Sequence, residues 1–223
     1  MDNRTNGSRL PHWNWEAKKG ETIPVYAYTN CDEVELFVNG KSYGKRVKGK
    51  DLTEVHTEYR GFLDSGYGFK RGMFKSKYRL SWNVPYQPGS IKVVAYKNGE
   101  VAATKEIKTA GKPAKIKLIA DRTEIDADGK DLSFITVRIE DKDGNLCPNA
   151  ENLVNFEITG NGVLESVGGN GNSASLESFK ENHIKAFYGK CLAIIKGTEE
   201  AGTINIKATS NGLEVDNIIV NTK

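Results

Sequence analysis

Aromatic side chains in loop-like segments are the residues of this chain whose type and placement best suit binding. A sugar ring packs its apolar C–H face on an exposed aromatic ring, and a few polar side chains orient it. Five aromatic residues lie in segments without a clear strand pattern: Trp13, Trp15, Tyr59, Tyr67 and Tyr86. Trp13 and Trp15 alternate with polar neighbours, so we expect both rings to point the same way. These residues are candidates for contact with a carbohydrate or with another domain.

A run of aspartates in the second half invites a calcium interpretation, because hard cations prefer carboxylate oxygens. The run comprises Asp126, Asp128 and Asp131. An EF-hand loop places its glycine after the third aspartate and a glutamate six residues later, whereas Gly129 comes too early and the glutamate is absent. We therefore interpret the run as a hairpin turn in which Gly129 supplies a positive φ angle.

Cysteine and histidine are too few and too scattered for a metal centre or a disulfide framework. Cys31, Cys147 and Cys191 are far apart and include no CxxC pair, so we expect three free, partly buried thiols. Three histidines argue against a multi-histidine site. We predict no metal, no cofactor and no catalytic residue in this chain.

Charge separates the chain into two parts. Residues 1–111 contain 19 Lys and Arg against 12 Asp and Glu, a net of +7, while residues 112–223 contain 13 against 17, a net of −4. The sign changes at the linker-like segment 110–113, which predicts two domains. The basic clusters at 41–50 and 70–79 are interpreted as solvated faces, and no nucleic-acid recognition motif accompanies them. No apolar run reaches the roughly 18 residues of a membrane span, so we expect no membrane partner.

Alternation of apolar and polar residues predicts β-strands in the first half. The three apolar residues Val34, Leu36 and Val38 share one face, and Asn39-Gly40 follows, a dipeptide typical of tight hairpin turns. Asn98-Gly99 predicts a second hairpin. Strands are expected at 23–29, 33–38, 41–47, 78–84, 90–97 and 100–108. The segment 59–77 has four glycines and no clear period, so we expect a long loop there.

The second half repeats the β pattern after the linker. Strands are expected at 114–120, 133–140, 153–159, 190–196, 203–209 and 213–220, separated by turns rich in Gly, Asn and Asp. A short helical turn fits residues 177–182. The predicted fold class is therefore all-β, with two tandem β-sandwich domains at 11–111 and 112–223 behind a disordered tail at 1–10.

Several stretches resemble a known enzyme family. PHWNWE (11–16), VYAYTNCDEVELFVNGKSYGK (25–45) and LSWNVPYQPGSIKVVAYKNGEV (80–101) resemble the domain that follows the catalytic barrel in Bacteroides-type glycoside hydrolase family 2 β-galactosidases. Residues 121–162 and 185–213 resemble the immunoglobulin-like C-terminal domain of the same enzymes. The latter segments are also similar to bacterial Ig-like domains of the invasin type.

The resemblance implies that this chain is an accessory part of a larger glycosidase. A TIM barrel and N-terminal domains would be its partners, and both catalytic glutamates would lie on the barrel. Glu16 is then expected at a domain junction, and Glu177 in a loop that hydrogen bonds hold in shape. A periplasmic or extracellular parent enzyme, which forms a homo-oligomer or contacts a glycan, fits this family.

Three functions remain open at this point. A brace for the barrel would leave an exposed apolar patch, a carbohydrate-binding pair would show a shallow groove with coplanar rings, and an invasin-like spacer would show neither.

Overall fold

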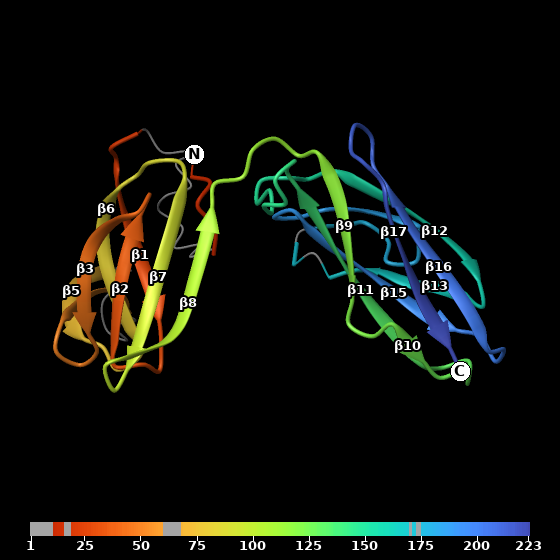
Figure 1. Ribbon diagram of the computed structural model, residues 1–223. Helices are drawn as coiled ribbons and strands as arrows, with labels where there is room; N and C mark the ends of the chain where they lie inside the picture. Colours follow the sequence, from red (N-terminus) through yellow and green to blue (C-terminus); the bar gives the residue numbers. More distant parts are fainter. Residues whose placement is uncertain (1–10, 16–18, 60–67, 170, 173–174) are drawn as a thin grey trace. The chain divides into compact units, whose positions relative to one another are not determined.

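The computed structural model describes residues 11–15, 19–59, 68–169, 171–172 and 175–223, with the backbone alone described for 53–59 and 68–74. These residues form strands, turns and extended segments, and no helix occurs among them (Figure 1). The chain divides into two compact units between Thr109 and Ala110, two residues before the boundary expected from the sequence. The all-β prediction is confirmed.

The first unit combines a four-stranded antiparallel sheet with a two-stranded one around a shared core. Leu36 and Val34 of the larger sheet and Leu80 and Val84 of the smaller one are almost fully buried in that core. The sheets have the orders β3 (Lys41–Val47), β2 (Glu33–Val38), β7 (Ser90–Lys97), β8 (Glu100–Lys108), and β1 (Thr22–Tyr28), β6 (Arg79–Pro85).

Both asparagine–glycine hairpins form as predicted. Asn39 and Gly40 have φ angles of 48° and 79°, and Asn98 and Gly99 have φ angles of 52° and 85°. Positive φ at both central residues matches the right-handed twist of the flanking strands, so the turns join β2 to β3 and β7 to β8.

The predicted long loop at 59–77 is wrong at Tyr59 and over residues 68–75, which are in strands, and residues 60–67 lie outside the described part of the chain. β4 (Leu52–Tyr59) pairs with β5 (Gly68–Lys75) as a separate antiparallel hairpin. Gly68 and Gly72 have no side chains, so they interrupt the alternation of apolar and polar residues from which a strand is predicted. Alternation of β-branched and charged residues in TEVHTEY (53–59) was a usable strand signal.

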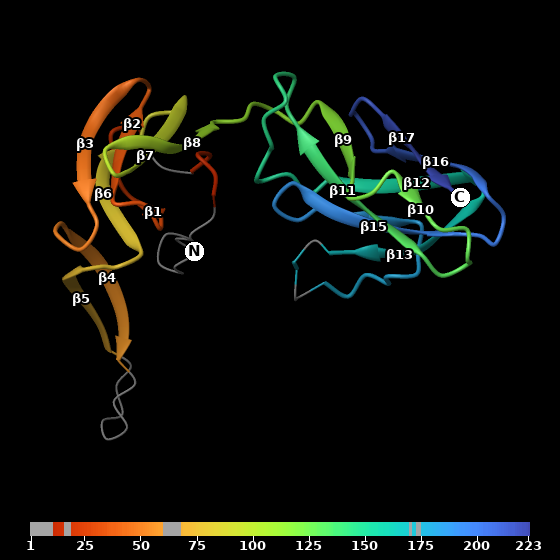
Figure 2. The ribbon, with the colours of Figure 1, turned by 60° about the horizontal axis from the view of Figure 1, so that its bottom comes forward.

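The second unit is an immunoglobulin-like sandwich of two sheets (Figure 2). The order β13-β15-β11-β9 of one sheet, opposite β17-β16-β12 of the other, is the strand arrangement of immunoglobulin domains. The strands are β9 (Lys115–Ala120), β10 (Glu124–Ile125), β11 (Leu132–Glu140), β12 (Leu153–Gly160), β13 (Gly162–Gly168), β14 (His183–Lys185), β15 (Lys190–Gly197), β16 (Gly202–Thr209) and β17 (Asp216–Thr222). Strands β10, β13 and β14 were not predicted.

Residues 177–182 are not helical, contrary to expectation. The carbonyl of Phe179 accepts a hydrogen bond from the Val167 amide at 2.9 Å, and the Glu177 carboxylate accepts one from the Lys185 amide at 3.1 Å. These contacts tie the segment to β13 and β14, and they replace the local hydrogen bonds that a helical turn needs.

The residues on either side of the division are held by their own units. The Thr109 amide donates to the Gly89 carbonyl at 2.7 Å in the first unit. The Gly111 amide donates to the Asp141 carboxylate at 2.8 Å in the second unit. Asp141 is almost fully buried and also accepts hydrogen bonds from the amides of Asp143 and Asn145, at 2.9 and 2.8 Å.

We expect Asp141→Asn to destabilise the second unit by about 2–3 kcal/mol, because a charged acceptor of several amides is lost. Burial raises the pKa of Asp141, but the amides of Gly111, Asn145 and Asp143 more than offset this and lower it to about 2. A carboxyl whose folded pKa is depressed stabilises the fold above its unfolded pKa of about 3.9 and loses that effect as the pH falls toward 2. Denaturant unfolding of wild type and variant should therefore differ at pH 6 and converge near pH 2. Asp143→Asn, an exposed aspartate in the same turn, is the control, and an equal Asp141→Asn effect at both pH values would contradict this account.

Candidate functional site

Trp13 lies in the core of the first unit. Its side chain is 2% exposed, and its indole Nε1 donates a hydrogen bond to the Gln87 carbonyl at 2.9 Å. The indole meets the buried ring of Tyr86 edge to face, with centroids 5.3 Å apart. Burial of this large side chain is favourable because its only polar atom has a partner. The Trp13 ring is therefore packed on the first unit and not exposed.

The backbone around Trp13 is fixed as firmly as its ring. The Thr109 hydroxyl donates to the Trp13 carbonyl at 2.8 Å, at the end of β8. Trp15 is half-buried, and its ring lies 4.4 Å from that of His12, between centroids. The structure thus joins Trp13, Trp15 and Tyr86 as one packed cluster. The buried rings of Trp13 and Tyr86 present no open face to a ligand.

The side chains of the other two predicted aromatic residues lie outside the described part of the structure. Tyr59 is the last residue of β4, where only the backbone is described, and Tyr67 lies outside the described residues. Tyr28 lies in a strand but not in the core, and its side chain is 63% exposed. The strand period explains this, because Ala27 faces the core and its neighbour must face outward.

The carboxylates that the sequence singled out stabilise turns. Asp128 accepts hydrogen bonds from the amides of Lys130 and Asp131, both at 2.8 Å, and Gly129 has a φ of 72° as expected. Asp131 pairs with Arg122 at 2.7 Å. That guanidinium and the amides of Asp126 and Leu132 lower the pKa of Asp131 to about 2. Across the described residues, no three His, Cys, Asp or Glu side chains group as metal ligands would.

Glu177 holds its loop, as expected, through a hydrogen bond from the Ser175 hydroxyl at 3.0 Å and one from the Lys185 amide. Glu16 lies outside the described residues. The three cysteines are free and buried, as predicted. Burial raises the pKa of Cys147 to about 11 and that of Cys191 to about 12, so both thiols stay protonated and unreactive at neutral pH.

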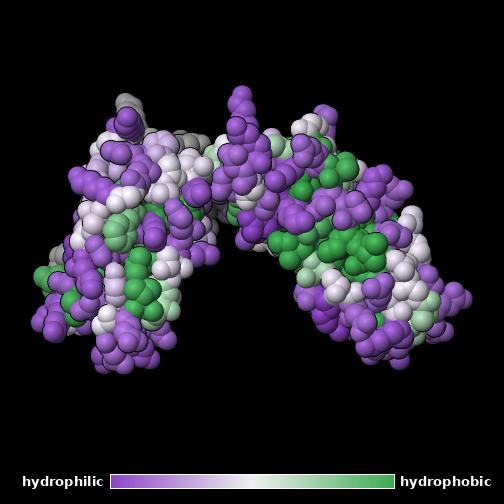
Figure 3. All heavy atoms as spheres, viewed as in Figure 1, coloured by the Kyte–Doolittle hydropathy of each residue, from purple (hydrophilic) through white to green (hydrophobic). Residues whose placement is uncertain are grey.

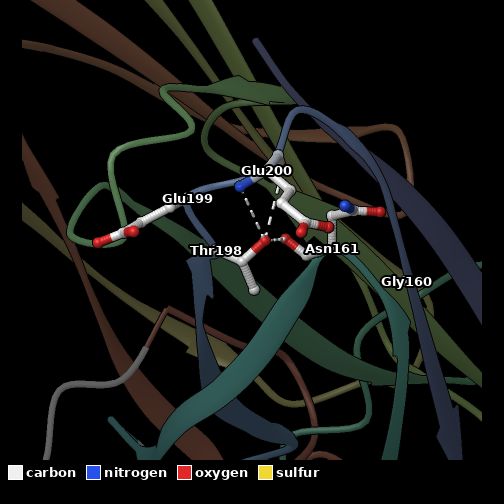
Figure 4. Close-up of a pocket in the computed structure, with 5 residues that line it drawn as sticks. All are labelled: Gly160, Asn161, Thr198, Glu199 and Glu200. Carbon is white, nitrogen blue, oxygen red and sulfur yellow. Dashed lines mark hydrogen bonds between the residues drawn. The ribbon is translucent and has the colours of Figure 1, made fainter.

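One hollow with two carboxylates opens at the end of the second unit (Figure 4). It is lined by Gly160, Asn161, Thr198, Glu199 and Glu200. The Glu199 and Glu200 side chains point away from each other in Figure 4, and Glu199 packs beside Gly129. Retaining hydrolysis of a glycoside needs two carboxyl groups facing one bond at about 5 Å. This hollow does not provide that arrangement.

The outer face of β9, β11 and β15 in the second unit carries apolar side chains. Phe134 pairs across the sheet with Ile194, while Ile119 and Leu192 lie on either side of Thr136. Ile119 and Phe134 are exposed. We call this set the β9–β11 face. Figure 3 shows further hydrophobic residues where Figure 1 draws β9 and β17, at the edge where strands of the two opposite sheets meet. A sandwich facing water on both sides would place polar residues at these positions.

The apolar character continues onto the segment after β13. The exposed ring of Phe179 packs beside Gly168, and Leu192 lies against the backbone of Gly169. Leu176, in the same segment, is fully exposed.

Two family models match the chain. Residues 116–219 match the family described as glycoside hydrolase family 2 C-terminal domain 5, and residues 20–103 match a domain of unknown function, DUF4982. These ranges lie in the second and the first unit, respectively.

Curated relatives cover both units. Beta-galactosidase BoGH2A of Bacteroides ovatus is 48% identical over 205 residues, which is 92% of this chain and 21% of that protein. A putative beta-glucuronidase of Formosa agariphila is 32% identical, over 86% of this chain and 16% of that protein. The chain therefore spans about a fifth of the length of these relatives.

Solved structures agree in fold. A glycosyl hydrolase family 2 member from Bacteroides cellulosilyticus matches with a TM-score of 0.77 and 36% identity, over 96% of this chain and 24% of that one. A beta-glycosidase from Bacteroides vulgatus matches with a TM-score of 0.78 and 31% identity, over 95% and 24%.

We expect Trp13→Ala to destabilise the first unit by about 3–5 kcal/mol, because it opens a large cavity beside Tyr86. Trp15→Ala, at a half-buried ring in the same segment, should cost about 1 kcal/mol. Denaturant unfolding followed by tryptophan fluorescence measures both losses of stability, because Trp82, which is buried in this unit, remains in each variant. A Trp13→Ala effect no larger than that of Trp15→Ala would show that the entry segment does not depend on the indole.

Proposed function

Because the chain belongs to the C-terminal domains of glycoside hydrolase family 2, we propose that it is the non-catalytic C-terminal part of a β-galactosidase and that it braces the catalytic barrel. The observation that carries this proposal is 48% identity to a β-galactosidase across both units. The parent enzyme would hydrolyse terminal β-galactosides with retention, and both of its catalytic carboxylates would lie outside this chain.

The arrangement of carboxylates within the described residues supports a non-catalytic role. Glu199 and Glu200 diverge, Glu177 holds a loop, and the buried Asp141 accepts backbone amides. Glu177 and Asp141 therefore have structural roles, and Glu199 and Glu200 do not face one bond. The chemistry of a glycosidase must then come from the part of the relatives that this chain does not span.

The β9–β11 face supports the bracing role. Its apolar residues lie on a sheet whose other side already covers a complete core, so folding of the second unit does not require them. Exposed apolar residues in a row are typical of a surface that another domain covers. We assign the catalytic barrel of the same polypeptide as that domain.

The purified chain should release no nitrophenol from nitrophenyl β-galactoside, because no facing carboxylate pair occurs among the side chains that the structure describes. The parent polypeptide, assayed at the same molar concentration, is the positive control. Activity of the isolated chain that disappears in Glu199→Gln or Glu200→Gln would contradict the non-catalytic assignment.

In the parent polypeptide, Ile119→Ser should lower the midpoint of thermal inactivation by several degrees, since an apolar contact with the barrel is lost. Leu153→Ser is the matched control, because Leu153 is 40% exposed on β12, in the sheet that does not contain β9, and Ile119 is 42% exposed. In the isolated chain neither substitution should change unfolding by more than about 0.5 kcal/mol. Equal effects of the two variants on the parent would remove the β9–β11 face from the proposal.

A further inference from the structure

Two tyrosines stand exposed at one end of the first unit. Tyr28 ends β1 and is 63% exposed, and Tyr78 precedes β6 and is 72% exposed. Tyr28 lies opposite Arg79 in the β1–β6 pair, and the Thr29 amide donates to the Tyr78 carbonyl at 3.0 Å. The pairing therefore brings both tyrosines to the same end of this two-stranded sheet.

Arg79 orders this end. Its guanidinium lies 5.1 Å from the ring centroid of Tyr26 and 6.0 Å from that of Tyr28. Tyr26 and Tyr28 are two residues apart on one strand, so they share the outer face of the sheet with Arg79. A cation beside the aromatic faces restrains both rings, which lowers the entropy lost when a ligand packs on them.

Three lysines lie on the segments next to Tyr78. The Gly49 amide donates to the Ser76 carbonyl at 3.2 Å, which joins the turn that carries Lys50 to the segment that carries Lys75 and Lys77. All three lysine side chains are exposed.

Two acidic side chains lie on the neighbouring segments. Asp32 accepts the Asn98 amide at 3.0 Å, and Asp51 accepts the Val47 amide. The three lysines and Arg79 outnumber these two carboxylates, so the charge on the described segments favours an anion.

We propose that this tyrosine–lysine surface, formed by Tyr28, Tyr78, Arg79, Lys50, Lys75 and Lys77, binds an acidic polysaccharide whose sugars carry carboxylate or sulfate groups. The tyrosine rings pack on the apolar faces of sugar rings, and the lysines pair with the anionic substituents along the chain. Several weak contacts spread over one surface suit a repeating polymer better than a small molecule.

The preference for a glycan over another polyanion rests on the proposed function, because a β-galactosidase whose terminal galactosides are carried on an acidic polysaccharide is held near them by contact with the charged sugars. The surface is distinct from the β9–β11 face. The isolated chain therefore tests this inference separately from the bracing role, and either proposal can fail without the other.

The experiment is affinity electrophoresis of the full 223-residue chain through gels containing polygalacturonate, with neutral galactan as the comparison. We expect retardation by polygalacturonate that weakens as salt rises from about 50 to 300 mM, because exposed charge pairs are screened. Retardation by galactan at equal concentration should be at least ten-fold weaker.

The variant Tyr28→Ala with Tyr78→Ala should lower the affinity for polygalacturonate at least ten-fold. Both side chains are exposed, so unfolding midpoints should stay unchanged and confirm that the variant folds. Tyr188→Ala, at a tyrosine 42% exposed in the second unit, is the matched control and should bind as wild type does.

Three outcomes would overturn the inference. The first is absence of binding to polygalacturonate and to a sulfated polysaccharide, and the second is wild-type affinity in the folded double variant. The third is equal affinity for oligodeoxythymidylate, which would make the surface a general polyanion site rather than a glycan site.

Discussion

The burial of Trp13 against Tyr86 is the contact on which the rest of the first unit depends. The indole fills the gap beside Tyr86, and two polar atoms of the tryptophan, Nε1 and the carbonyl oxygen, have partners. Because the carbonyl accepts from Thr109, the entry segment and the last residue of the unit are held side by side. A chain that enters at Trp13 and leaves at Thr109 therefore anchors both ends on one core.

Each unit anchors the chain on its own side of the division. In the first unit Thr109 binds the Trp13 carbonyl, 96 residues away in the sequence, and in the second unit Asp141 binds the Gly111 amide, 30 residues away. Both anchors join residues that are distant in the sequence, so each depends on the fold of its own unit.

The two units offer surfaces of different chemistry. The second unit carries an apolar row on a sheet whose core is already complete, and this suits permanent contact with another domain. The first unit carries exposed tyrosines among lysines, and this suits reversible contact with a charged, hydrated polymer. The same all-β architecture thus supports two kinds of recognition, because side chains alternate between the core and the outer face along every strand.

Much of the fold was predictable, because its signals are local. Both asparagine–glycine turns and the alternation around Leu36 specify hairpins whatever surrounds them. Strand β14 has three residues and β10 has two, so neither contains enough of a period to be detected. The site was harder to predict. Burial of Trp13 depends on Tyr86, 73 residues away along the chain, and no local pattern records that contact. The exposure of Tyr28, by contrast, follows from a local pattern, because its neighbour Ala27 faces the core.

Hydroxyl-radical footprinting of the isolated chain and of its parent polypeptide tests the central claim most directly, since it reports the solvent exposure of each aromatic side chain. The account predicts that Phe134 and Phe179, both exposed here, react several-fold more slowly in the parent, while Tyr28 and Tyr78 react equally in both. Equal labelling of Phe134 and Phe179 in the two proteins would contradict it, because no domain would then cover the face that we assign to the barrel.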